Sequence, residues 1–205
     1  MKEDFYYQQA RLKGYRSRAS FKLQQINNKF RVFRKGQTII DLGASPGGWS
    51  QIASHLVGGK GKVIAIDKSY ISPFKETQVD ILNMDILNRN LPSTILETYG
   101  KTDGLISDCS PNISGDFSRD HSIQISLAKR ALVLTQSLLK PNGFFICKLF
   151  QGTELQDFIK DMKEHFETTK LHKPAASRKK SAEIYVVGLK YNTKQDSSIE
   201  TEIKE

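Results

Sequence analysis

One glycine-rich segment contains residues of the types that bind nucleotide-like ligands. Residues 41–51 read DLGASPGGWSQ and follow an apolar run, residues 38–40, that is typical of a short buried strand. Beyond the segment, apolar residues recur at helical spacing as far as residue 57. The glycines permit a tight turn and a close approach of backbone to a ligand, and the following helix N-terminus offers free N–H groups. This strand–loop–helix arrangement predicts a nucleotide or cofactor site.

The loop differs from the two best-known nucleotide-binding loops. It lacks the GxGxxG spacing of dinucleotide-binding proteins, and it has no Lys followed by Ser or Thr, which a phosphate-binding loop requires. A turn that binds nothing is one alternative, but three glycines and a proline beside an aspartate are an unusual combination for a plain turn. The loop therefore favours a different cofactor, and a nicotinamide or flavin cofactor on the same sheet remains the second possibility.

Aspartates stand at the ends of the first four predicted strands or shortly after them. The strands cover residues 38–41, 62–66, 79–82 and 104–107, and the aspartates are Asp41, Asp67, Asp85 and Asp108. Open α/β sheets bind ligands at the carboxyl ends of their strands, near the point where the strand order reverses. We therefore expect these side chains to line one rim of a single cleft, although each aspartate alone is equally consistent with a turn or a helix cap.

The elements that must position these residues alternate between strand and helix patterns. Further strands are predicted at residues 144–150, 166–171 and 183–190, and helices at 49–57, 91–99, 122–140 and 154–165. The pattern predicts an α/β fold of Rossmann-like type, with a seven-stranded, mostly parallel sheet and helices on both faces. The last strand should pair antiparallel, because the connection before it is too short for a crossover helix.

Two short helices are predicted ahead of the first strand. Residues 5–13 form an amphipathic segment ended by Gly14, and Ser17 or Ser20 could cap a second helix. We expect residues 1–35 to be an N-terminal helical extension of one domain that covers residues 1–191. Residues 192–205 are polar and charged and predict a flexible tail.

Composition narrows the class of protein. The chain has 205 residues, of which 38% are hydrophobic, and no apolar stretch approaches the roughly 20 residues of a membrane span. Its N-terminus lacks the layout of a signal peptide. Cys109 and Cys147 are too few for a disulfide framework, and the four histidines form no cluster with them. We expect a cytoplasmic, monomeric protein with no membrane contact and no bound metal.

The net charge of +9 favours a polyanionic partner, most often a nucleic acid. Basic residues crowd the first 35 positions, and a second cluster occupies residues 178–180. If the fold brings the two clusters together, they would form a phosphate-binding stripe beside the cleft; two ordinary solvated faces are the alternative. The residues expected in the stripe are Lys13, Arg16, Arg18, Arg31, Arg34 and Arg178 to Lys180.

Five ordered motifs resemble the FtsJ-type (RrmJ/RlmE) RNA 2′-O-ribose methyltransferases, which have the class I methyltransferase fold. The motifs are residues 16–23, 41–51, 107–115, 147–152 and 177–185, and the resemblance runs from about residue 11 to residue 190. The departures are small: Ser45 replaces the usual Ala, Cys109 and Ser110 replace Met and Ala, and Lys180 precedes Ser181.

The resemblance implies a catalytic tetrad of Lys22, Asp108, Lys148 and Glu183, in which Lys148 is the proton acceptor. A ribose hydroxyl is a poor nucleophile until its proton is being removed, and a lysine can remove it only in the neutral form. Burial or a neighbouring cation favours that form, and Lys22 could be the cation; Asp108 and Glu183 act in the opposite direction. A snorkelling surface lysine is the alternative for Lys148, but the flanking residues are apolar.

The implied cofactor is S-adenosylmethionine, lying across residues 43–49. Asp67 would hold its ribose hydroxyls, Asp85 its adenine amino group, and Asp108 would lie at its methionine end. The cofactor-binding residues expected from the loop are Gly43, Gly47, Gly48 and Trp49.

The resemblance also implies an RNA substrate. One branch of the family methylates a uridine 2′-hydroxyl in the A-loop of large-subunit (23S) ribosomal RNA, and the compact chain favours this target, free or in the assembled subunit. A tRNA anticodon loop is the alternative target, and an mRNA cap would require a guanine site for which 205 residues leave little room. A non-catalytic RNA-binding factor for ribosome assembly is the competing class of function.

Overall fold

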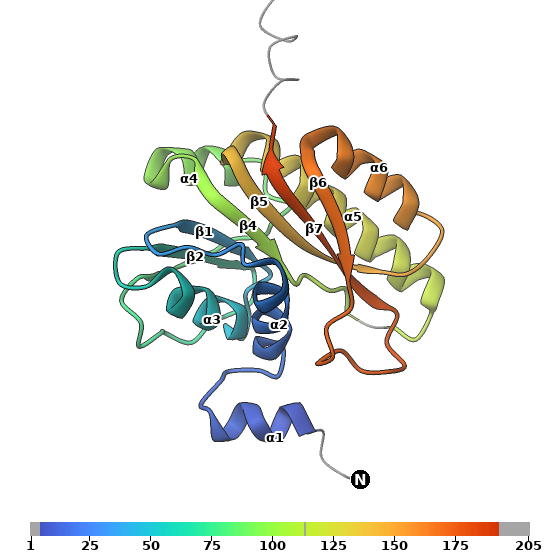
Figure 1. The fold of residues 1–205 in the computed structure, drawn as a ribbon, viewed down its shortest axis with the longest axis horizontal. Helices are drawn as coiled ribbons and strands as arrows, with labels where there is room; N and C mark the ends of the chain where they lie inside the picture. The colour runs from blue at the N-terminus through green and yellow to red at the C-terminus, as the bar shows by residue number, and fades with distance from the viewer. Residues whose placement is uncertain (1–4, 113, 193–205) are drawn as a thin grey trace, which may run out of the picture.

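A seven-stranded sheet forms the centre of the protein, in the order β3-β2-β1-β4-β5-β7-β6 (Figure 1). The computed structural model describes residues 5–112 and 114–192. The strands are β1 (Thr38–Leu42), β2 (Lys62–Asp67), β3 (Val79–Asn83), β4 (Thr102–Ser107), β5 (Leu139–Phe150), β6 (Phe166–His172) and β7 (Glu183–Tyr191). The helices are α1 (Phe5–Leu12), α2 (Ser20–Phe30), α3 (Gly48–Val57), α4 (Leu91–Tyr99), α5 (Phe117–Leu138) and α6 (Leu155–His165).

The strand order confirms the predicted α/β class and its mostly parallel sheet. Strands β1 to β5 pair in parallel, whereas β7 pairs antiparallel with both β5 and β6, as the short connection before β7 required. The order reverses between β1 and β4, which are direct neighbours although β2 and β3 lie between them in the chain. Their carboxyl ends therefore border the crevice in which this class of sheet binds ligands.

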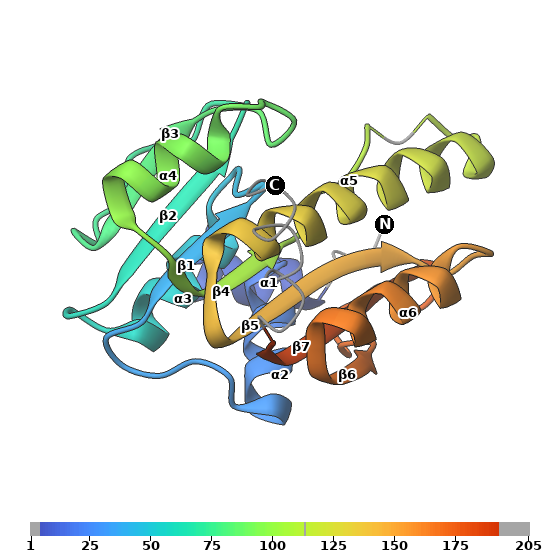
Figure 2. The same ribbon diagram turned by 90° about the horizontal axis from the view of Figure 1, so that it is seen from above.

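Helices cover both faces of the sheet, and the alternation along β5 separates the two cores (Figure 2). Phe145, Cys147 and Leu149 belong to the core that includes residues of α4, α5 and α6. Phe144 and Ile146 belong to the core that includes residues of α2 and α3. Because side chains alternate along a strand, the next even-numbered residue, Lys148, lies on the α2 side of the sheet.

Three predicted boundaries were wrong. Helix α5 begins at residue 117 rather than 122, because Asp116 caps it by accepting a hydrogen bond from the Arg119 amide at 3.2 Å. The helix ends at Leu138, and β5 already starts at Leu139 instead of 144. Residues 141–143, which lie between the predicted helix and the predicted strand, form an irregular part of β5, where the pairing register with β4 shifts.

The N-terminal extension is attached through the start of α2. Neither Ser17 nor Ser20 caps this helix, because Ala19 occupies the cap position without a side-chain bond. The Ser20 hydroxyl instead donates to the Gly48 carbonyl at 3.1 Å and ties α2 to the glycine-rich loop. Residues 193–205, where most of the predicted tail falls, lie outside the described residues. No helix within the described ranges is long and apolar enough to cross a membrane.

Candidate active site

Loops at the carboxyl ends of β1 to β4 enclose a cavity of about 340 Å³ with acidic walls, here called the acidic cavity. Gly43 follows β1, Asp67 ends β2, Asp85 follows β3 and Asp108 follows β4; all four line the cavity. The structure therefore brings together three of the four strand-end aspartates and the first loop glycine. The wall is suited to a ligand with hydroxyl and amino groups and a positive charge.

The backbone around this cavity is held in place by two residues. Gly43 has a φ of +71°, and a Cβ there would approach the Cys109 sulfur to 2.6 Å, so only glycine lets β1 and β4 lie this close at their ends. Asp67 accepts hydrogen bonds from the Ser45 amide at 3.0 Å and the Ser69 amide at 2.8 Å. Its carboxylate is thus fixed in orientation at the cavity wall.

Asp41 does not lie on the rim, which corrects the prediction. The strand continues to Leu42, and the Asp41 side chain is completely buried beneath the loop. Its Oδ2 accepts a hydrogen bond from the Ser50 hydroxyl at 2.5 Å, and its Oδ1 has no hydrogen-bond partner among the described residues. Burial, reinforced by the charges of Asp108 and Asp67, raises the pKa of Asp41 to about 8 despite the bond from Ser50.

The second half of the loop faces the N-terminal extension. A Cβ on Gly47 would meet the Arg16 side chain at 2.9 Å, and one on Gly48 would collide with the hydroxyl of Ser17. Trp49 is buried, and its indole N–H donates to the Ala19 carbonyl at 2.9 Å. These three residues are not among those that line the acidic cavity, so their role in cofactor binding stays a prediction.

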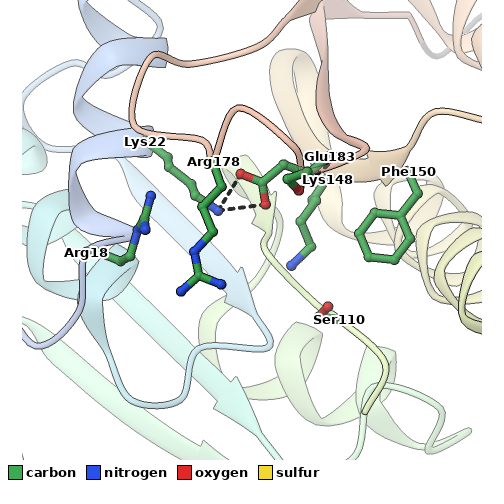
Figure 3. A pocket seen from close by; sticks show the side chains of 8 residues that line it. Arg18, Lys22, Ser110, Lys148, Phe150, Arg178 and Glu183 are labelled. Carbon is green, nitrogen blue, oxygen red and sulfur yellow. Dashed lines mark hydrogen bonds and ion pairs between the residues drawn. The ribbon is translucent and has the colours of Figure 1, made fainter. Parts of the chain in front are cut away.

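A second cavity of about 250 Å³, here called the cationic cavity, lies next to the first (Figure 3). It is lined by Arg18, Lys22, Ser110, Lys148, Phe150, Arg178, Ser181 and Glu183. Four of these eight side chains are basic, and Glu183 is the only acidic one. Ser110 also lines the acidic cavity, so the two cavities share a wall.

Lys22 and Glu183 form a nearly buried ion pair inside the cationic cavity. The Lys22 Nζ lies 2.7 Å from Oε1 and 2.8 Å from Oε2 of Glu183, and each residue is only 9% exposed. The pair joins α2 to the first residue of β7, which are 161 positions apart in the chain. A pair removed from solvent to this degree holds its geometry, because either group alone would be costly to bury.

Lys148 and Asp108 form a second pair at the wall between the cavities. The Lys148 Nζ donates to the Asp108 carbonyl at 2.6 Å and lies 3.2 Å from Oδ1 of the same residue. Lys148 faces the cationic cavity, whereas Asp108 faces the acidic one. Three residues of the predicted tetrad therefore line the cationic cavity, and Asp108 pairs with Lys148 from the acidic one.

Comparison with known proteins identifies the family. The model of the family described as FtsJ-like methyltransferase matches residues 15–191. The chain belongs to the FtsJ-like methyltransferase family. A Methanocaldococcus jannaschii protein named ribosomal RNA large subunit methyltransferase E is 44% identical over 198 residues, which cover 95% of this chain and 81% of that protein. The protein of the same name from Archaeoglobus fulgidus is 42% identical over 190 residues, which cover 93% of this chain and 97% of that protein.

Solved structures show the same fold. A Plasmodium falciparum protein described as a ribosomal RNA methyltransferase superposes with a TM-score of 0.78 at 27% identity, covering 86% of this chain and 98% of its own. An O-methyltransferase from Thermotoga maritima, described as SAM-dependent, superposes with a TM-score of 0.54 at 17% identity, covering 82% of this chain and 64% of its own. The second likeness concerns the fold alone.

Two residues that contact the predicted tetrad were missed from the sequence. The Tyr185 hydroxyl donates to the Asp108 Oδ1 at 2.7 Å, and burial raises the pKa of this phenol well above its usual value, so it stays a donor. Gln124 of α5 donates to the Lys148 carbonyl at 2.9 Å. Tyr185 could have been found, because it stands two positions after Glu183 on a strand and shares its face. No sequence signal marks Gln124.

Two of the predicted RNA-binding arginines lie at the cationic cavity. Arg18 and Arg178 come from the two distant basic clusters and both line its wall. An Arg18 N–H donates to the Ala176 carbonyl at 2.5 Å, two positions before Arg178. Burial, and then the charge of Arg178, lowers the pKa of Arg18. Two cations held this close form an attractive position for an anion.

Other members of the predicted stripe are placed elsewhere. The Arg16 guanidinium donates to the carbonyls of Ser72 and Pro73 and stacks 3.7 Å from the centre of the Phe74 ring, so it clamps a loop. Arg34 precedes β1 and so lies at the amino edge of the sheet, opposite the cleft. Arg31 follows the far end of α2, about 14 Å along the helix from Lys22. For Arg31 and Arg34 the prediction was therefore wrong.

Proposed function

We propose that the protein is an S-adenosylmethionine-dependent RNA ribose 2′-O-methyltransferase that acts on large-subunit ribosomal RNA, with a uridine of the A-loop as its target. The observation that carries the proposal is the Lys148–Asp108 pair at 3.2 Å, where an acidic and a cationic cavity share a wall. The choice of RNA is supported by the relatives named ribosomal RNA large subunit methyltransferase E.

The acidic cavity has the chemistry that S-adenosylmethionine requires. Gly43 lines the cavity with backbone alone, and Asp67 presents a fixed acceptor suited to ribose hydroxyls. Asp85 and Asp108 add acceptors for an amino group and for a positively charged methionine end. The buried Oδ1 of Asp41, which has no partner among the described residues, is a further polar atom beneath the loop.

The chemistry of the proposed reaction assigns a proton acceptor to this chain. When bound, S-adenosylmethionine supplies a methyl group activated by its attachment to a positively charged sulfur. Lys148 takes the proton from the ribose 2′-hydroxyl, whose oxygen receives the methyl group in place of that proton, and the demethylated cofactor is the leaving group. Asp108, itself fixed by Tyr185, holds the lysine side chain in position. Lys22, paired with Glu183, lines the same cavity as Lys148.

The cationic cavity is the proposed site of the acceptor RNA. Arg18 and Arg178 provide positive charge for a phosphate group next to the ribose that meets Lys148. Phosphate contacts of this kind position the RNA without reading its sequence. The choice of target would therefore depend on RNA shape and on contacts outside this cavity.

The test is transfer of a labelled methyl group from S-adenosylmethionine to RNA, followed by mapping of ribose methylation. Large-subunit ribosomal RNA, free and in the assembled subunit, is compared with tRNA, all from cells that lack the gene. We expect one 2′-O-methyl group in the A-loop. Calorimetry with S-adenosylmethionine, its demethylated product and NAD tests the cofactor in parallel.

The outcomes separate the alternatives. Methylation confined to tRNA anticodon loops would show that tRNA is the target instead of ribosomal RNA, and would leave the proposed methyl transfer unchanged. RNA binding without methyl transfer would favour the non-catalytic class. Binding of NAD, with no binding of S-adenosylmethionine or its product, would refute the proposed cofactor.

A further inference from the structure

Phe150 is an aromatic residue at the cationic cavity that the proposed chemistry does not use. It is half-buried at the last position of β5, whereas all seven residues from Gly143 to Leu149 are buried. It lies two positions after Lys148, so both side chains project from the same face of the strand, about 6–7 Å apart along it. That separation is one that the ribose and base of a single nucleoside span.

The two arginines of the cavity lie away from this ring. Figure 3 shows the Lys148 side chain between the guanidinium groups of Arg18 and Arg178 and the Phe150 ring. The pairing of β5 with β7 sets Phe150 opposite Glu183 and Lys148 opposite Tyr185, which fixes the order of these groups along the wall. One end of the cavity is thus cationic and the other aromatic, with the proposed base in the middle.

We infer that the cavity holds one unstacked nucleotide of the substrate RNA, with its base stacked on Phe150, its ribose at Lys148 and its phosphate at Arg18 and Arg178. The inference rests on the proposed function and adds the orientation of the nucleotide and the residue that receives its base. An aromatic ring stacks on any base because every base has a π-face. In a duplex the faces of a base are covered by its neighbours, so the target must lie in a loop or be displaced from a helix.

The first test compares Phe150→Leu with Phe150→Trp in methyl transfer to transcribed large-subunit ribosomal RNA. Leucine keeps an apolar side chain but removes the π-face, and base stacking on an aromatic ring is worth about 1–3 kcal/mol. We therefore expect Phe150→Leu to raise the KM for RNA by about 5- to 150-fold, and Phe150→Trp to stay within a few fold of the wild type. Binding of the demethylated cofactor product should be unchanged in both variants. Phe117→Leu is the matched control, because Phe117 is an exposed phenylalanine outside both cavities.

A second test does not depend on catalysis. Phe150→Trp places an indole in the cavity, and stacking of a base should quench its fluorescence when the same RNA is added. Phe117→Trp should show no such change, and the buried Trp49 contributes equally to both variants.

Failure of this inference can be told apart from failure of the proposed function. If the wild type transfers no methyl group to RNA, the proposed function fails, and the quenching experiment alone decides whether a base stacks on residue 150. If the wild type is active and Phe150→Leu has an unchanged KM and kcat, Phe150 does not receive the base. Equal quenching of the two tryptophan variants would also overturn the inference.

Discussion

The acidic and cationic cavities are built from different parts of the chain. The acidic cavity uses the loops that follow β1 to β4, so each of its walls comes at the end of a parallel strand. The cationic cavity joins residues near position 20 to residues near position 180, from α2 and the segment before β7. The first is a property of the parallel sheet, whereas the second exists only because an N-terminal extension packs against the antiparallel edge.

The difference in charge also separates the two proposed ligands. A positively charged methyl donor is favoured by three aspartates, and a polyanionic RNA is favoured by two arginines and two lysines. The pair formed by Lys148 and Asp108 links the two sets directly. Each ligand would thus be held by its own cavity, and the reacting groups would meet at the shared wall.

Removal of Lys148 should have the largest effect on the rate, because it deletes the proposed base while both cavities remain. We expect Lys148→Ala to lower kcat by about 10²- to 10⁴-fold, as is typical when a general base is removed. Binding of the demethylated cofactor product, measured by calorimetry, should be retained.

A lysine on the same strand provides the control. Lys140 also lies on β5 but pairs with Asp103 at 2.9 Å at the other end of the strand, so Lys140→Ala should keep its activity. Equal labelling of RNA by the wild type and Lys148→Ala would show that Lys148 is not the base.

The Lys22–Glu183 pair should matter for folding as well as for the reaction. Lys22→Ala leaves the nearly buried Glu183 carboxylate without its partner, and breaking such a pair typically costs about 3–5 kcal/mol. Urea unfolding should show this loss. The Lys190–Glu167 pair has a similar separation of 2.8 Å but is exposed, so Lys190→Ala should cost less than about 1 kcal/mol. Equal losses in the two variants would mean that the cationic cavity does not depend on its buried pair.

The acidic cavity was the more predictable of the two from the sequence. Strand periodicity and strand-end aspartates are local signals, and parallel strands necessarily gather their carboxyl ends at one edge. Asp67, Asp85 and Asp108 could therefore be assigned to one rim before the fold was known. Asp41 could not be separated from them, because the strand extends one residue further and turns its side chain into the core.

The cationic cavity was predictable only in part, since it depends on packing between distant segments. Basic composition suggested a stripe but could not show that Arg18 reaches the cavity while Arg16, two positions earlier, clamps a loop instead. The tetrad itself followed from motif resemblance, not from periodicity. The contacts of Tyr185 and Gln124 depend on the pairing of β5 and on the placement of α5, which no local pattern specifies.

The burial of Asp41 predicts a pH dependence that distinguishes it from the aspartates of the acidic cavity. With a pKa of about 8 in the folded protein and about 4 in the unfolded chain, Asp41 binds a proton more strongly when folded. The free energy of unfolding should therefore fall as the pH rises from about 4 to 8, by up to about 1.4 kcal/mol per pH unit from this group.

Asp41→Asn imitates the protonated side chain and should lack this contribution. Urea unfolding of both proteins between pH 4 and 9 gives the comparison, because all other groups titrate in both. The advantage of the wild type over the variant should shrink across this window and become constant above it. Parallel curves would mean that Asp41 is ionised in the folded protein, and that the acidic cavity has a fourth negative charge beneath it.

The smallest effect should appear at the arginines, because their contacts with phosphates replace counterions that are bound to the RNA. Replacing Arg18 and Arg178 with Gln should weaken RNA binding and reduce the slope of log affinity against log salt by about one unit for each lost phosphate contact. Arg31→Gln together with Arg34→Gln removes the same charge from exposed positions away from the cavity and should leave the slope nearly unchanged. Because both double variants lower the net charge equally, a difference between them reports position and not total charge. Equal slopes would place the RNA phosphates outside the cationic cavity.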